Sequence, residues 1–146
     1  MQYIWTTDSP EETIALAERI GALLKAGDCI AYRGDLGAGK TTFTRGLALG
    51  MGLGDCVTSP TFALVHEYGG GKLIHFDMYR IMDESELETT GFYDYPLDES
   101  VFAVEWSENI DAALPPDTIH ITLEYTGDES RRITLEGDER FADIGT

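Results

Sequence analysis

The stretch Gly34-Asp35-Leu36-Gly37-Ala38-Gly39-Lys40-Thr41 decides the fold of this 146-residue chain, because it satisfies the pattern G-x-x-x-x-G-K-[ST]. Glycines let successive backbone N–H groups turn inward and form a concave nest for an anion, which a Cβ would obstruct. Lys40 would reach the β- and γ-phosphates of a nucleotide, and the Thr41 hydroxyl would bind Mg²⁺. A helix that begins at Lys40 would add its N-terminal dipole to the attraction for phosphate.

The residues on either side of this loop have the patterns of a strand and a helix. The apolar run 29–32 precedes the loop, as a buried strand should. After the loop, Phe43, Leu47 and Met51 are spaced four residues apart, which is typical of one face of a helix, and Gly50 supplies a stop. The pattern therefore predicts a phosphate-binding loop between a strand and a helix.

Composition indicates one globular domain that spans residues 1–146. Hydrophobic residues make up 42% of the chain, so a continuous core is expected. The chain has 27 Asp and Glu residues against 10 Lys and Arg, with a net charge of −17, and such a surface repels polyanions. Two interpretations of the acidity stay open: adaptation to solubility or salt, and docking of a basic partner.

Neither cysteine usage nor a targeting signal points away from the cytosol. Cys29 and Cys56 have neither metal-binding nor redox-motif spacing, and Cys29 falls in the apolar run before the loop. The N-terminus does not resemble a signal peptide, and no stretch resembles a membrane span. A cytoplasmic protein without membrane attachment is expected.

Periodicity and turn residues predict the remaining elements. Ser9, Pro10 and Glu12 form a capping box with proline at the first helical position, and Gly27 is expected to close that helix. Further along, the chain predicts a hairpin of strands 62–68 and 73–78 around a glycine turn, an acidic helix 84–89, a buried strand 101–104, and a hairpin of strands 119–125 and 131–135.

Two carboxylates are candidates for the chemistry beside the loop. Glu105 follows the apolar strand 101–104, at the place where a second Mg²⁺ ligand or a water-ordering carboxylate is expected. Asp77, at the end of the strand 73–78, is the second candidate. Together with Lys40, they are the predicted catalytic residues.

Other polar and aromatic residues near these strands have weaker cases. A lone histidine on a strand is more often a structural residue than a base, so His75 is interpreted as structural. Arg80 fits a contact to the γ-phosphate and an ion pair about equally well. Trp106 is interpreted as a core or interface residue.

Four ordered motifs carry a resemblance to a known family. They are Gly34 to Thr42, Ser59-Pro60-Thr61-Phe62, His75-Phe76-Asp77-Met78-Tyr79-Arg80 and Val104-Glu105-Trp106. In sequence and spacing they resemble the TsaE (YjeE) family, the bacterial ATPases of the tRNA threonylcarbamoyladenosine pathway, from about Ser9 to about Leu135.

The resemblance implies a fold, an activity and partners. It implies a compact α/β, P-loop NTPase-like three-layer fold with a central mixed, partly antiparallel sheet. It implies slow hydrolysis of ATP with Mg²⁺, and assembly with TsaD and TsaB, which modify adenosine 37 of tRNA. Because the chain is strongly acidic, no direct tRNA binding is expected for the isolated chain.

Carried onto this sequence, the resemblance assigns nucleotide and metal contacts. Thr41 and Glu105 match the Mg²⁺ ligands of the family, and Arg132 in the terminal hairpin matches a basic residue. Residues 59–61 and Asp77 match segments that resemble switches near the γ-phosphate. The phosphate contacts of the family match Gly37, Ala38, Gly39, Lys40, Thr41 and Thr42.

Rival classes fit less well, and two alternatives stay open. A signalling GTPase needs Asn-Lys-x-Asp to read guanine, and the single asparagine, Asn109, is followed by isoleucine. A small-molecule kinase needs several lid arginines, but no basic cluster follows the loop helix. That kinase and a nucleotide-dependent scaffold without productive hydrolysis are the alternatives to the ATPase.

Overall fold

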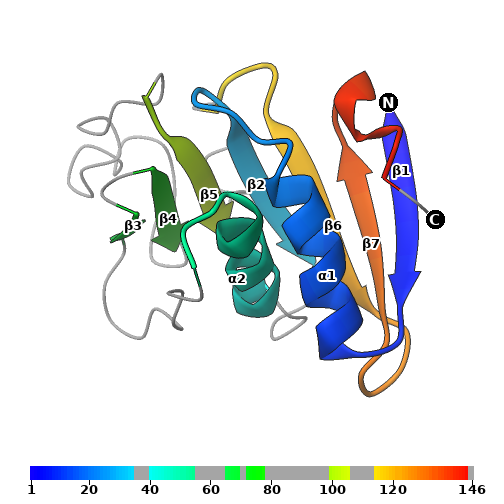
Figure 1. Ribbon diagram of the computed structural model, residues 1–146. Helices are drawn as coiled ribbons and strands as arrows, with labels where there is room; N and C mark the ends of the chain where they lie inside the picture. Colours follow the sequence, from blue (N-terminus) through cyan, green and yellow to red (C-terminus); the bar gives the residue numbers. More distant parts are fainter. Residues whose placement is uncertain (35–39, 55–64, 70–71, 78–98, 106–113, 145–146) are drawn as a thin grey trace.

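Seven strands form one sheet in the computed structural model, which describes residues 1–34, 40–54, 65–69, 72–77, 99–105 and 114–144. The order across the sheet is β1-β7-β6-β2-β5-β4-β3, with β1 at one edge and β3 at the other (Figure 1). The strands are β1 (Gln2–Thr7), β2 (Cys29–Gly34), β3 (Val65–Tyr68), β4 (Leu73–Asp77), β5 (Val101–Glu105), β6 (Ile119–Tyr125) and β7 (Arg131–Glu136).

The centre of the sheet is parallel and its edges are antiparallel. β2 runs parallel to β5 and β6, and β4 runs parallel to β5. At the edges, β7 is antiparallel to both β6 and β1, and β3 is antiparallel to β4. The predicted mixed, partly antiparallel sheet and the predicted terminal hairpin are confirmed. Residues 62–64 of the first predicted hairpin and the acidic helix 84–89 lie outside the described residues.

Two helices lie side by side across the same face of the sheet (Figure 1). They are α1 (Pro10–Gly21) and α2 (Lys40–Gly50). The described part of the chain thus shows a helical layer and a sheet, and the predicted third layer is not represented in it. No helix in the described ranges is long and apolar enough to cross a membrane.

The start of α1 is as predicted, but its end is not. Ser9 caps the helix by accepting a hydrogen bond from the Glu12 N–H at 3.2 Å, and proline stands at the first position. The helix ends at Gly21 instead of Gly27, because the Leu23 and Leu24 N–H groups bond to carbonyls three residues earlier, at 3.0 and 3.2 Å, and the Lys25 N–H then donates to the Asp28 carboxylate at 2.7 Å. In a continuing helix that N–H would bond to the carbonyl four residues earlier.

The core lies between the helices and one face of the sheet. It combines large side chains of both layers, and Tyr32 on β2 meets Phe43 on α2 edge-to-face, with the ring centroids 6.1 Å apart. The residues of the other face in β2, β4 and β5, such as Ala31, Phe76 and Val104, are also fully buried. The parallel centre is therefore enclosed on both faces, as the apolar runs 29–32 and 101–104 predict.

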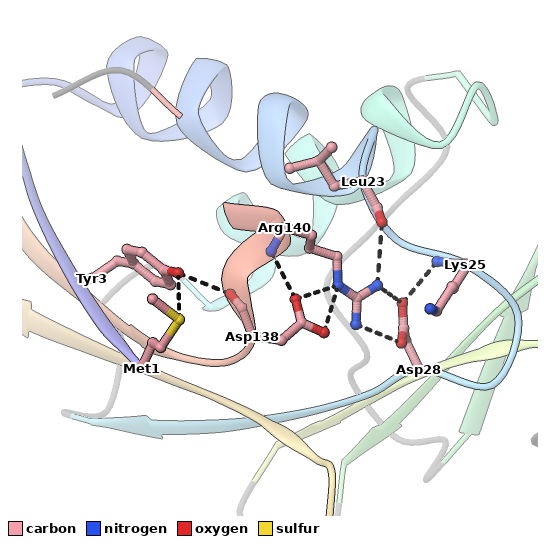
Figure 2. Close-up of polar contacts among 7 residues, drawn as sticks. All are labelled: Met1, Tyr3, Leu23, Lys25, Asp28, Asp138 and Arg140. Carbon is pink, nitrogen blue, oxygen red and sulfur yellow. Dashed lines mark hydrogen bonds and ion pairs between the residues drawn. The ribbon is translucent and has the colours of Figure 1, made fainter. Parts of the chain in front are cut away.

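A C-terminal turn closes the end of the sheet opposite the loop. The 3₁₀ helix η5 (Glu139–Phe141) inserts Phe141, which is fully buried, and directs Arg140 toward Asp28 just before β2 (Figure 2). The Arg140 guanidinium donates to both oxygens of Asp28, at 2.7 and 3.0 Å. These hydrogen bonds raise the pKa of Arg140 above its ordinary value.

Candidate nucleotide-binding site

The carboxyl-terminal ends of β2, β4 and β5 lie at the same end of the sheet, and α2 begins there. These three strands are parallel, so their last residues lie at the same end of the sheet. These residues are Gly34, Asp77 and Glu105. In open α/β sheets, ligands bind in the crevice outside the carboxyl ends of the strands. Three separate parts of the sequence therefore reach the end of the sheet where such a ligand is expected.

The predicted phosphate-binding loop connects β2 to α2. β2 ends at Gly34 and α2 begins at Lys40, so the motif fills the connection between the two elements. Lys40 and Thr41 form the first turn of α2, as predicted, and Thr42 is partly buried. The predicted contact residues Gly37, Ala38 and Gly39 lie outside the described residues, and the description of Lys40 and Thr41 is limited to their helical backbone.

Glu105 is a buried carboxylate at the end of β5. The residue is 8% exposed, and its Oε2 lies 2.7 Å from Nε2 of His75 on β4. Asp77 is the backbone partner of Glu105 in the parallel pairing of β4 with β5. The two predicted carboxylate positions are thus neighbours in the sheet, although the side chain of Asp77 is outside the description.

The contact between His75 and Glu105 is a feature of the candidate site that the sequence does not predict. The sequence predicts a structural role for His75, and its fully buried ring fits that role; the ring is also directed to Glu105, the predicted metal ligand. In the sheet, His75 lies beside Ala103, which is two residues before Glu105. The side chains of His75 and Glu105 are therefore on the same face, the one covered by the helices. In each strand, side chains alternate between the two faces of the sheet, and this pattern can be read from the sequence. It identifies the contact between His75 and Glu105 only once the register of β4 and β5 is known.

A second contact joins the loop helix to the sheet. The Tyr32 hydroxyl on β2 and the Thr44 hydroxyl on α2 are hydrogen-bonded at 2.8 Å, and both residues are fully buried. Burial raises the pKa of Tyr32 above its ordinary value, against the hydrogen bond with Thr44, and the negative charge of Glu105 raises it further. Thr44 lies one turn after Lys40 and Thr41, so this bond fixes the first turns of α2 to β2.

The other predicted contact residues are described only in part. Arg132 lies on β7, where it is half-exposed and forms an ion pair with Glu124 on β6 at 3.3 Å. The predicted switch residues 59–61, together with Arg80 and Trp106, lie outside the described residues.

The chemistry of the buried carboxylates fits a hard cation at Glu105. Glu105 and Asp28 are the two buried carboxylates in the described ranges. Asp28 is neutralised by Arg140, whereas Glu105 has, among the described residues, the His75 imidazole as its hydrogen-bonding partner. Mg²⁺ prefers oxygen ligands, uses one or two carboxylates and keeps several waters. It therefore needs no cluster of three or more His, Cys, Asp or Glu side chains, and none that could hold a metal occurs in the described part.

The described cysteine offers no alternative chemistry. Cys29 is a free thiol and only 2% exposed. Burial raises the pKa of Cys29 to about 12, so almost none of it is a thiolate near neutral pH. Cys29 is a small core residue, as the sequence predicts.

Comparisons with known proteins agree with these features. The family model "Threonylcarbamoyl adenosine biosynthesis protein TsaE" matches residues 7–133. The tRNA threonylcarbamoyladenosine biosynthesis protein TsaE of Bacillus subtilis is 44% identical over 136 residues, which cover 92% of this chain and 85% of that protein. The protein of the same name from Haemophilus influenzae is 48% identical over 108 residues, covering 73% of this chain and 68% of that protein.

A solved structure extends the agreement to the fold. The crystal structure of Bacillus subtilis YdiB superimposes with a TM-score of 0.74 at 37% sequence identity, covering 99% of this chain and 91% of that chain. The predicted family resemblance and the α/β fold are confirmed. The chain belongs to the TsaE family of tRNA threonylcarbamoyladenosine biosynthesis proteins.

Proposed function

We propose that this chain is a Mg²⁺-dependent ATPase that supports formation of threonylcarbamoyladenosine at position 37 of tRNA by acting on the TsaB–TsaD complex. The pathway follows from the family, while the hydrolysis of ATP, the metal and the two partner proteins are our proposal. The Bacillus and Haemophilus relatives are both named for tRNA threonylcarbamoyladenosine biosynthesis.

The observation that carries the proposal is the position of the loop motif between β2 and α2. A match to G-x-x-x-x-G-K-[ST] is meaningful when it follows a strand and opens a helix, and this one does both. The N-terminus of α2 then faces the expected phosphates with its positive dipole end. Adenine is favoured over guanine because the sequence lacks Asn-Lys-x-Asp.

Glu105 and Thr41 are the residues that would hold the metal. When bound, Mg²⁺ would neutralise the phosphate charge that develops during hydrolysis. Glu105 is long enough to hold the metal through a water or to order the attacking water, and burial makes its charge more effective than it would be in bulk water. Lys40 would hold the β- and γ-phosphates, and Asp77 would act beside Glu105.

The decisive experiment is reconstitution of the tRNA modification with TsaB, TsaD, tRNA and this chain. We expect Lys40→Ala to lose ATP binding in calorimetry while the fold is kept, because the charge that holds the phosphates is removed. Lys72→Ala is the matched control, since Lys72 is an exposed lysine ahead of β4. We expect Glu105→Ala to bind ATP but to lose Mg²⁺-dependent hydrolysis and multiple turnovers of the complex.

Three outcomes would contradict the proposal in different ways. Near-native ATP binding by Lys40→Ala would remove the loop assignment. Full turnover of the complex by Glu105→Ala would favour a nucleotide-dependent scaffold in which hydrolysis is not productive. Transfer of the γ-phosphate to a small molecule, without an effect on tRNA modification, would favour a kinase.

A further inference from the structure

The contact between His75 and Glu105 combines deep burial with a short hydrogen bond. The side chain of His75 is fully buried and that of Glu105 is 10% exposed, and Nε2 lies 2.7 Å from Oε2. Such a distance is typical of a hydrogen bond in which one partner carries charge. Because both groups are withdrawn from water, the contact fixes the direction of the carboxylate more firmly than an exposed pair would.

The other ring nitrogen indicates which atom carries the proton. Nδ1 of His75 is buried and has no hydrogen-bond partner among the described residues. A neutral imidazole with its proton on Nδ1 would bury an unsatisfied N–H donor, which loses its hydrogen bond to water without gaining another. With the proton on Nε2, the ring donates to the acceptor Glu105 and leaves only a lone pair on Nδ1.

The surrounding strands hold the imidazole in place. His75 lies beside Ala103 in the parallel pairing of β4 and β5, and this small side chain leaves room for the ring to reach diagonally to Glu105. Both strands are in the buried parallel centre of the sheet, so neither side chain can turn into solvent and break the contact. The orientation of Glu105 is thus set by the sheet through His75.

We infer that His75 is a positioning residue, whose Nε2–H orients the Glu105 carboxylate toward the divalent cation of the bound nucleotide. The inference rests on the proposed function, because it assigns His75 a part in holding the metal at that site. Residues that hydrogen-bond a metal-ligating carboxylate fix its direction, and their loss typically weakens metal binding or activity by about 10–100-fold.

Two substitutions separate the hydrogen bond from packing. His75→Gln keeps an N–H donor, because its amide nitrogen can occupy the place of Nε2, while His75→Leu removes the donor and keeps an apolar side chain. His120→Leu is the matched control. His120 is also an imidazole with a buried Nδ1 that has no hydrogen-bond partner in the described part, but it is on β6, two strands away from β5.

The test measures Mn²⁺ binding by electron paramagnetic resonance in the presence of a non-hydrolysable ATP analogue. We expect His75→Leu to weaken Mn²⁺ binding by about 10–100-fold, and His75→Gln and His120→Leu to bind it as the wild type does. Binding of the analogue without metal should be equal in all four proteins. Hydrolysis should fall in His75→Leu and be rescued in His75→Gln.

The ring itself is observed by ¹⁵N NMR in the protein without nucleotide or metal. We expect Nε2 of His75 to be protonated and its proton to exchange slowly with water, and the signal is assigned by its absence in His75→Gln. An unprotonated Nε2 would overturn the inference even if the His75→Leu variant fails to fold.

Failure of the inference and failure of the proposed function give different results. Wild-type Mn²⁺ binding by a folded His75→Leu variant would overturn the positioning role and leave the ATPase proposal intact. A wild-type chain that binds no Mn²⁺ with the ATP analogue would overturn the proposed function, and the positioning role with it.

Discussion

Arg140 shows how a single side chain can hold distant parts of this chain together. It lies 112 residues from Asp28 in sequence and donates to both of its carboxylate oxygens. It also donates to the Leu23 carbonyl and to Asp138, so one guanidinium joins the C-terminal turn, the end of α1 and the start of β2 (Figure 2). Asp28 has an exposed fraction of only 8%, which makes this partner important.

We expect Arg140→Met to lower the free energy of unfolding by about 1.5–3 kcal/mol, because it leaves the buried Asp28 without its charged donor. Urea unfolding followed by circular dichroism measures the change. Arg132→Met is the matched control: its pair with Glu124 is half-exposed, so the loss should be only about 0–1 kcal/mol. Equal losses in the two variants would show that burial of Asp28 does not decide the strength of its ion pair.

The sequence predicts the role of a residue when that role is set by its neighbours along the chain. The loop motif and Glu105 are predicted as site residues because each is defined by the few residues around it. The contacts of His75 with Glu105 and of Arg140 with Asp28 are not predicted, because each joins two strands or turns whose pairing only the folded chain determines. The sequence therefore predicts a structural role for His75 without naming its partner, and it does not single out Arg140.

At the level of elements, the contact between α1 and α2 depends on glycine. A Cβ on Gly46 of α2 would lie 2.5 Å from the Ala17 Cβ and 2.7 Å from the Ile14 carbonyl oxygen on α1. Neither can yield easily, because one is a short side chain and the other is backbone. The close approach of the helices places α2, and with it the end of the loop, on β2.

We expect Gly46→Ala to destabilise the protein by about 1–3 kcal/mol, because α1 and α2 must move apart. The sign is informative, since alanine in a helix interior is otherwise more favourable than glycine by about 0.5–1 kcal/mol. Gly127→Ala is the matched control, because a Cβ there would meet nothing closer than the Ser130 Oγ at 3.4 Å. Thermal unfolding compares the two, and a stabilised Gly46→Ala variant would contradict the close packing.

The elements predicted from the sequence were those with strong internal patterns. The apolar runs of β2 and β5, the periodic face of α2 and the hairpin of β6 and β7 were confirmed. The edge strand β1 was missed, although Trp5 and Thr7 alternate with exposed neighbours, because a short strand at a chain end has no turn on its far side. The end of α1 differs from the prediction because its last N–H groups, from Leu23 on, bond to carbonyls three residues earlier, and no residue type in the sequence marks that change.

At the scale of the whole molecule, the net charge of −17 acts on all elements together. The described ion pairs involve few of these charges, and exposed acidic residues such as Glu67, Glu129 and Asp143 add to the repulsion. Repulsion of this kind opposes the compact state, and it weakens as salt shortens the range of the charges. It would also draw the chain toward a basic partner surface, where salt would have the opposite effect.

We expect the free energy of unfolding to rise when NaCl is increased from about 0.01 M to about 0.5 M, because the screening length falls well below its initial value of about 30 Å. A variant with Glu67→Gln, Glu129→Gln and Asp143→Asn should show a smaller rise, since it has lost three exposed charges but keeps the same core. Urea unfolding at each salt concentration gives the slope for both proteins. Equal slopes would mean that these three exposed charges do not contribute to the repulsion, and no rise in the wild type would mean that the acidity does not strain the fold. The same measurement in MgCl₂ at matched ionic strength, without nucleotide, tests for cation binding in addition to screening. If stability rises more in MgCl₂ than in NaCl, and the extra rise disappears in Glu105→Gln, a cation binds at the end of β5.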